Sequence, residues 1–155
     1  MKKIRVEVNR KIFELEIRDS ELLIETLRDR LGFLGTKYSC LEGDCGVCTV
    51  LLDGKNILSC LTLAADTDGK KVLTIEGLAD KGKLHPLQES FIEKGAIQCG
   101  FCTPGMILAS KVLLDKNPKP GDEEIMAALD GNLCRCTGYI KIIEAVREAS
   151  KKERP

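Results

Sequence analysis

Residues 98–105 read QCGFCTPG, and this stretch decides how the second half of the chain is interpreted. It places Cys99 and Cys102 at the C-x2-C spacing in a sequence that is 31% charged. Two thiols at this spacing are more typical of metal ligands than of core side chains. Residues 132–139, NLCRCTGY, hold a further pair, Cys134 and Cys136. We therefore predict that these four cysteines form one ligand set.

A second set of four cysteines lies in the first half of the chain. Its members are Cys40, Cys45, Cys48 and Cys60. The first three follow the C-x4-C-x2-C run of plant-type 2Fe-2S ferredoxins, although the fourth comes much sooner than in those proteins. Gly43 and Gly46 suit a loop that winds closely around sulfide and directs backbone amides at it. Structural zinc is the weaker alternative here, because the paired-knuckle spacing is absent.

The spacing alone leaves the metal of the second-half set open. Cys99 and Cys102 also fit a zinc knuckle or a redox dithiol, and a disulfide is a weaker possibility. Pro104 suits the start of a helix, whose positive end favours an anionic thiolate group. The positive end of a helix favours zinc thiolate and iron-sulfur thiolate equally, so it does not decide which metal is bound.

Composition narrows the class of protein. The 24 basic and 24 acidic side chains cancel, and no basic run with interleaved aromatics indicates nucleic acid or an anionic membrane as a partner. We found no signal peptide and no apolar segment near the roughly 20 residues of a membrane span. We therefore expect a soluble, cytoplasmic protein, where a reducing environment disfavours disulfides.

The first 77 residues predict a β-grasp domain. Alternating apolar residues indicate strands over 4–8 and 12–17, and Ser20 is a candidate cap for a helix over 21–31 that Gly32 ends. Strands over 49–52 and 56–59, joined at Asp53-Gly54, form a hairpin that brings Cys48 beside Cys60. A short strand over 71–75 completes the sheet.

The composition changes over 78–83, which we interpret as a linker. Residues 84–150 then predict four helices in a four-helix bundle: two begin at Pro86 and Pro104, and two are capped by Asp122 and Thr137. Residues 151–155 are expected to be a frayed, solvated tail. The residues expected to face inward are Leu87, Phe91, Ile92, Ile107, Ser110, Leu114, Ile125, Met126, Leu129, Ile140, Ile143 and Val146. The predicted fold class is thus α+β, with a ferredoxin-like domain followed by a helical one.

The sequence offers no catalytic constellation. His85 is the only histidine, and its place before Pro86 favours a residue at a helix start over a ligand or proton carrier. No Ser, His and Asp set is available, and the carboxylates are spread as solvated faces. We predict no catalytic residue in this chain.

Four stretches together carry a resemblance to a known family. They are CLEGDCGVC at 40–48, LHPLQ at 84–88, QCGFCTPG at 98–105 and NLCRCTGY at 132–139. In this order they resemble the iron-sulfur subunit of molybdenum hydroxylases, the family of xanthine dehydrogenase, aldehyde oxidoreductase, aerobic carbon monoxide dehydrogenase and 4-hydroxybenzoyl-CoA reductase. The resemblance implies one 2Fe-2S cluster in each domain, and it favours iron-sulfur over zinc for the second set.

The resemblance also implies partners. A large subunit would bind molybdopterin, in its cytosine dinucleotide form, and a medium subunit FAD, in a dimer of heterotrimers. The Cys40 set would lie nearer the flavin and the Cys99 set nearer the pterin, with Gln98 and Cys136 approaching the pterin ring. The expected function is a relay of single electrons between the two partner sites. The alternatives are a free electron carrier with two clusters and a non-redox adaptor protein that is stabilised by zinc.

Overall fold

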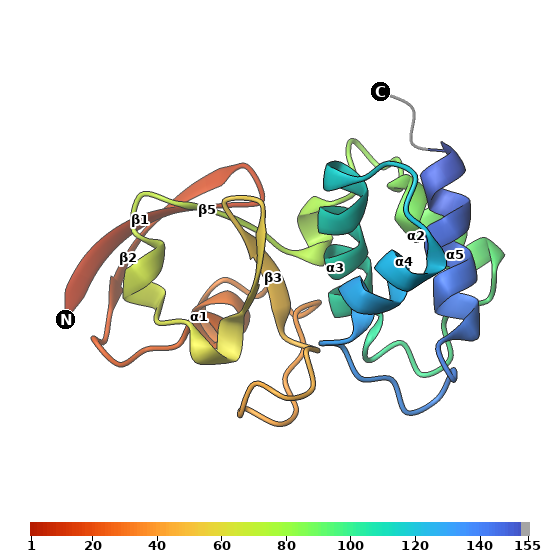
Figure 1. Ribbon diagram of the computed structural model, residues 1–155. Coiled ribbons are helices and arrows are strands. Elements are labelled where there is room, and N and C mark those ends of the chain that lie inside the picture. Colours follow the sequence, from red (N-terminus) through yellow and green to blue (C-terminus); the bar gives the residue numbers. More distant parts are fainter. Residues whose placement is uncertain (153–155) are drawn as a thin grey trace.

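The computed structural model describes residues 1–152, which form a sheet in the first half and a group of helices in the second (Figure 1). The strands are β1 (Lys2–Val8), β2 (Lys11–Ile17), β3 (Thr49–Leu52), β4 (Lys55–Leu58) and β5 (Lys71–Leu73). Their order in the sheet is β2-β1-β5-β3-β4. β1 and β5 run parallel, and the other neighbouring pairs are antiparallel. This arrangement confirms the predicted α+β class and the two predicted hairpins.

The sheet follows from the alternating sequence pattern. Ile4, Val6 and Val8 are buried on one face of β1, whereas Arg5 on the other face is exposed. Side chains that alternate in this way bury one face of a strand and leave the other in water. The predicted bounds differ slightly, since β1 begins two residues earlier and β2 one residue earlier. β4 begins and ends one residue earlier, and β5 ends at Leu73.

The helix of the first half differs from the prediction at its start. An α-helical turn, α1 (Leu23–Glu25), continues into a π-helical turn, η1 (Thr26–Arg30). Ser20 does not cap it, because Leu22 is extended and bridges Leu63. The carboxylate of Glu25 instead accepts the Leu22 amide at 2.9 Å. The predicted end is correct, since Gly32 follows the helix with a φ of 73°.

A buried carboxylate joins this helix to the segment that follows β2, where it accepts the Arg18 amide at 3.3 Å. Glu21 is 1% exposed, and it accepts hydrogen bonds from Thr26 at 2.8 Å and from Arg30 at 2.6 Å. Burial opposes the charge of Glu21, but the hydrogen bonds from Thr26 and Arg18 and the charges of Arg30 and Arg18 outweigh it. The pKa of Glu21 is therefore lowered.

The second half contains α2 (Pro86–Glu93), α3 (Thr103–Lys116), α4 (Asp122–Leu129) and α5 (Ile140–Lys152). α2 packs along α5, and α3 lies against the sheet at β3 (Figure 1). His85 is at the start of α2, as predicted, and its Nδ1 accepts the Leu87 amide at 3.2 Å. Short 3-10 turns connect the elements: η2 (Ser59–Leu61), η3 (Ala64–Thr67) and η4 (Ile75–Gly77).

Several predicted details of the helices are wrong. Asp122 is the first helical residue of α4 rather than its cap, and the side chain of Thr137 contacts Cys134 instead of capping α5. Ile92, Met126 and Ile140 are exposed, because the buried stripes use neighbouring positions such as Ile142 and Ala145. The other nine residues expected to face inward are buried, except Ile143, which is half-buried.

The ends of the helical region also differ from the sequence pattern. Helix α5 includes Lys151 and Lys152, which we expected in the frayed tail; the remaining part of that tail, 153–155, lies outside the described residues. The lysine ammonium groups reach back to acidic side chains, since Lys152 contacts Glu93 at 2.5 Å. Cations in the last turn of a helix are also favoured by its dipole.

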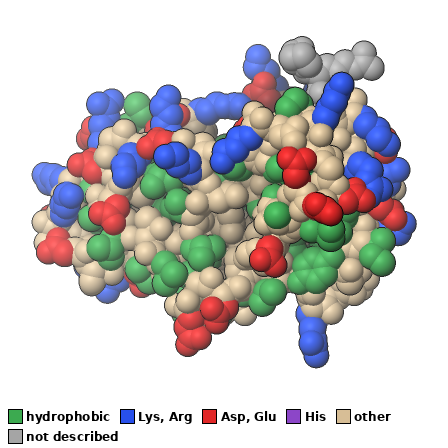
Figure 2. All heavy atoms as spheres, viewed as in Figure 1, with side chains coloured by type: hydrophobic (Ala, Val, Ile, Leu, Met, Phe, Trp, Pro, Cys, Tyr) green, Lys and Arg blue, Asp and Glu red, His purple; other side chains and the backbone are tan. Residues whose placement is uncertain are grey.

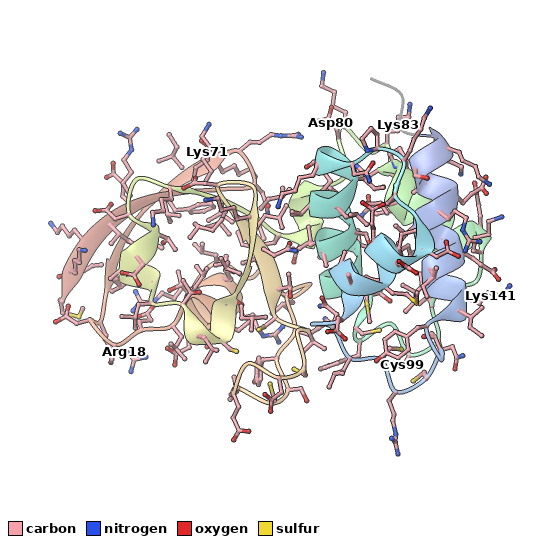
Figure 3. All side chains as sticks on the ribbon, viewed as in Figure 1. Arg18, Lys71, Asp80, Lys83, Cys99 and Lys141 are labelled. Carbon is pink, nitrogen blue, oxygen red and sulfur yellow. The ribbon has the colours of Figure 1, made fainter. Side chains whose placement is uncertain are left out.

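The two halves share a buried contact. Leu51 of β3 packs with Leu108 and Val112 of α3, and all three are less than 8% exposed. Leu78, within the expected linker, is also buried and packs into the helical core. The sheet and the helices therefore meet over an apolar contact. The cysteine loops of both halves lie along the same side of the molecule, the lower side in Figure 3.

Candidate metal centres

The first cysteine set is built by a loop and a hairpin. The loop before β3 carries Cys40 and Cys45, whose sulfur atoms are 3.2 Å apart. The β3–β4 hairpin then returns the chain, so that Ser59 donates both its amide and its hydroxyl to the Cys48 carbonyl, at 3.3 and 2.7 Å. Cys48 and Cys60 consequently lie together in one buried cluster, with their side chains hydrogen-bonded. The structure thus confirms that the hairpin brings these two thiols side by side.

Backbone amides make part of this site favourable for thiolate. The amides of Glu42 and Cys45 point at the Cys40 sulfur, at 3.5 and 3.4 Å. These hydrogen bonds lower the pKa of Cys40 to about 6. Gly43, with a φ of 91°, provides the left-handed backbone that the loop needs to turn these amides inward.

Cys60 has the opposite environment. It is 3% exposed, and burial, followed by the contact with Cys48, raises its pKa to about 12. A buried thiolate without a cation is unfavourable. Coordination by a metal removes this cost, because a coordinating thiol is deprotonated by the charge of the ion.

The second set joins two loops that are far apart in the sequence. Cys99 lies between α2 and α3, and Cys102 directly precedes the first residue of α3. Cys134 and Cys136 lie between α4 and α5. The Cys99 and Cys136 sulfur atoms are 3.6 Å apart, and the side chains of Cys102 and Cys134 are hydrogen-bonded. Figure 3 labels Cys99 at the edge of the helical half. The structure therefore brings the four predicted residues together.

The thiols of the second set also differ in their electrostatics. Burial, followed by the contact with Cys134, raises the pKa of Cys102 to about 12. Burial also opposes ionisation of Cys134, but hydrogen bonds from the hydroxyl and the amide of Thr137 outweigh it, and its pKa is lowered. The two Thr137 atoms lie 3.0 and 3.5 Å from the Cys134 sulfur. Contact with Cys99 raises the pKa of Cys136.

Both sets share a two-and-two arrangement of thiols. In the first set, Cys40 lies close to Cys45, and Cys48 lies close to Cys60. In the second set, Cys99 lies close to Cys136, and Cys102 lies close to Cys134. In a 2Fe-2S cluster with four cysteine ligands, each iron takes two thiolates. Within residues 1–152, no group of three or more Cys, His, Asp or Glu side chains meets the geometry of a single metal-ion site. The chemistry and pairing of the thiols fit two binuclear clusters.

The two cysteine sets differ in how far their side chains are exposed to solvent. Cys99 and Cys136 are exposed, and so are Gln98 and Phe101 beside them. In the first set, Cys48 and Cys60 are buried, and Cys40 and Cys45 are partly so. The second set therefore has the more open edge, and this edge includes Gln98 and Cys136, the two residues that the family resemblance implies would approach a pterin.

Sequence reasoning did not find three polar residues of these loops. Asn132 is 5% exposed and bonds the Gly46 carbonyl, Thr49 bonds the same carbonyl, and the Tyr139 hydroxyl accepts the Cys134 amide at 2.9 Å. The positions of Asn132 and Tyr139 within NLCRCTGY were the available signal, since both flank the cysteines. Their contacts arise only when loops distant in sequence meet.

The fold and the two cysteine sets define a two-domain iron-sulfur protein. Residues 6–74 match the family described as 2Fe-2S iron-sulfur cluster binding domain, and residues 74–147 match the 2Fe-2S binding domain family. The chain belongs to the small iron-sulfur subunits of the molybdenum hydroxylases, as its cysteine motifs suggest. Its role is electron transfer within an oxidoreductase complex, in which it is a non-catalytic subunit. Within residues 1–152, no helix combines the length and apolar character needed to cross a membrane.

Similar proteins cover nearly the whole chain. The nicotinate dehydrogenase small FeS subunit of Eubacterium barkeri is 48% identical over 96% of this chain and 95% of its own length. The xanthine dehydrogenase iron-sulfur-binding subunit of Escherichia coli O157:H7 is 46% identical over 96% of this chain and 94% of its own length. A chain of quinoline 2-oxidoreductase from Pseudomonas putida 86 has a TM-score of 0.94 and 41% identity, covering 97% of this chain and 94% of that one.

Proposed function

We propose that the eight cysteines hold two 2Fe-2S clusters that relay single electrons between molybdopterin in a large subunit and FAD in a medium subunit. The first cluster is assigned to Cys40, Cys45, Cys48 and Cys60, and the second to Cys99, Cys102, Cys134 and Cys136. The observation that carries this assignment is that the four thiols of each cysteine set form two close pairs. When bound, each cluster supplies one-electron redox chemistry.

The chain's own residues bind and shield these groups. The amides of Glu42, Cys45 and Thr137 donate to sulfur, which stabilises negative charge there. Buried Cys48, Cys60 and Cys102 keep water from one side of each site. Bound charge is then surrounded by fixed dipoles rather than mobile solvent, so little rearrangement accompanies a change of one electron.

The open edge of the second set supports contact with the pterin. Gln98 and Cys136 are exposed, and Cys136 contacts Cys99, the neighbour of Gln98. Exposed apolar side chains surround both cysteine loops, and apolar surface marks contact with another protein. They include Leu41, Leu61, Ile97, Phe101 and Leu133. On the face shown in Figure 2, apolar side chains of the helical half lie among interspersed basic and acidic groups.

The proposed assembly is a dimer of heterotrimers in the cytoplasm, with molybdopterin in its cytosine dinucleotide form. The names of the relatives support separate partner chains, since they describe small or iron-sulfur-binding subunits. All eight cysteines are free thiols, which fits a reducing compartment. The relatives' names range over nicotinate and xanthine, so we place the choice of substrate in another subunit.

The proposed domain bounds are 1–77 and 84–150, joined by 78–83. Support comes from the cores: one apolar cluster centres on β1 and α1, and another on α2, α3 and α5. Each domain then surrounds one cysteine set. The buried contact through Leu108 holds the two domains against each other.

Metal analysis and copurification test the proposed function. The chain, purified anaerobically, should contain four iron atoms and four sulfides, two of each for every 2Fe-2S cluster. Reduction with dithionite should bleach the visible absorbance and produce two distinguishable EPR signals. Stoichiometric zinc or a single EPR signal would refute the two-cluster assignment. A brown monomer that binds no larger subunits would favour the free carrier over the complex.

A further inference from the structure

The loops that carry the two cysteine sets touch directly. The Leu133 amide donates to the Cys45 carbonyl at 2.9 Å. Cys45 belongs to the first set, and Leu133 directly precedes Cys134 of the second. One hydrogen bond therefore joins the backbone of a proposed ligand in one domain to the residue beside a proposed ligand in the other.

Asn132 adds a second connection at the same place. Its buried side-chain amide donates to the Gly46 carbonyl at 2.8 Å and lies 3.4 Å from the Thr49 hydroxyl. Thr49 in turn donates that hydroxyl to the Gly46 carbonyl at 2.7 Å. The backbone amide of Asn132 bonds the Leu129 carbonyl at the end of α4. The asparagine thus ties the end of α4 to the loop that carries Cys45 and Cys48.

The backbones meet too closely for side chains to intervene. A Cβ atom on Gly46 would lie 2.0 Å from the Gly131 carbonyl oxygen, and one on Gly105 would lie 2.7 Å from the Gly46 carbonyl oxygen. Gly105 belongs to the first turn of α3, two residues after Thr103. Three segments of backbone therefore pack around the amide of Asn132, and any change in that amide is transmitted to both loops.

We propose that Asn132 is a positioning residue that fixes the separation and relative orientation of the two clusters. The inference rests on the proposed function, because it requires both cysteine sets to hold 2Fe-2S clusters. The physical basis is that the two hydrogen-bonded residues, Gly46 and Leu133, are each next to a proposed cluster ligand in the sequence. A shift of either loop therefore displaces that ligand. Electron exchange between two centres falls steeply with distance, and a rigid contact at this point keeps the distance short.

The test uses the full chain with its clusters and replaces single side chains. Asn132→Asp puts an acceptor where the donor faces the Gly46 carbonyl, and Asn132→Ala removes the side-chain amide without adding a charge. Thr49→Ser retains the hydroxyl, and Asn56→Ala changes an exposed asparagine on β4. Magnetic interaction between the two reduced clusters, measured by EPR, reports their separation. Hydrogen exchange at the Leu133 amide reports the contact itself.

We expect Asn132→Asp and Asn132→Ala to keep both cluster signals but to lose the resolved splitting between them. Exchange at Leu133 should accelerate about two- to tenfold, as expected for the loss of one hydrogen bond. Thr49→Ser and Asn56→Ala should match the unmodified protein. If Asn132→Asp loses iron, Asn132→Ala decides the question, because it removes the side-chain amide and introduces no buried charge.

Two failures are distinguishable. Unchanged splitting and unchanged exchange in Asn132→Ala, with full iron content, would overturn the positioning role and leave the two-cluster function intact. Absence of a second cluster in the unmodified protein would overturn the proposed function itself.

Discussion

Gly46→Ala should destabilise the protein more than a glycine replacement with the same backbone conformation elsewhere. Gly46 has a φ of 68°, and Gly54, in the β3–β4 turn, has a φ of 78°. A Cβ atom on Gly54 has nothing within 4 Å, whereas one on Gly46 would lie 2.0 Å from the Gly131 carbonyl oxygen. The two variants therefore share the backbone cost and differ in the packing cost.

The magnitude follows from these two terms. A non-glycine residue in the left-handed conformation costs about 1–2 kcal/mol, which applies to both variants. Gly131 must also retreat by about 1 Å or more in Gly46→Ala, because Cβ atoms essentially never approach other atoms within 3.0 Å. Overpacking of this kind typically adds about 1–3 kcal/mol. For a chain of this size, that addition corresponds to a further decrease in the unfolding midpoint of roughly 2–12 °C.

The assay is the thermal loss of visible absorbance, with both variants and the unmodified protein heated at one rate. Gly54→Ala should lower the midpoint slightly, and Gly46→Ala should lower it clearly further. Equal midpoints for the two variants would show that the loops do not meet at Gly46 as closely as the structure indicates.

Three further changes probe other parts of the molecule. Cys136→Ser should remove one of the two reduced-state EPR signals and half of the iron, while the Cys40 cluster remains, because the sets lie in separate loops. Glu21→Gln should lower the free energy of unfolding at pH 7 by about 1.5–3 kcal/mol, the usual contribution of hydrogen bonds to a charged group such as those from Arg30. Because the pKa of Glu21 is lowered on folding, its stabilisation is complete above the ordinary glutamate pKa of about 4.3 and is lost as the pH falls through the folded value, so the difference should shrink in acid. Leu108→Ala should cost about 2–5 kcal/mol in denaturant unfolding, since its buried side chain fills the contact between the domains.

Each of these changes has its own control. Loss of both EPR signals in Cys136→Ser would mean that the two cluster sites depend on each other. Glu14→Gln, at an exposed position of β2, should have little effect at any pH, and a pH-independent loss in Glu21→Gln would contradict the ionised state of that carboxylate. Leu61→Ala should cost far less than Leu108→Ala, because Leu61 is 59% exposed.

Local pattern predicted the secondary structure well where one face of an element is buried along its whole length. β1 and β2 are correct because strict alternation leaves one register that buries Ile4, Val6 and Val8. The start of α1 was wrong because the contact of Leu22 with Leu63, 41 residues away, keeps that residue extended. The start of α5 was wrong because the hydroxyl of Thr137 contacts the Cys134 sulfur and accepts the Tyr139 amide, and Tyr139, with a φ of 67°, lies outside the helix.

The sequence alone determined the two groups of cysteines, because ligand spacing and the glycines of a tight loop are local properties of the chain. It also determined the alternation of the strands and the start of α2 at Pro86, and it came within one residue of the start of α3, which is Thr103 rather than Pro104. The hairpin pattern also predicted that Cys48 lies beside Cys60. Only the tertiary structure decided the other thiol pairs, and which polar groups hold one loop against the other. Those contacts, such as Asn132 with Gly46, join residues 86 positions apart, and their geometry depends on how the sheet and α3 pack together.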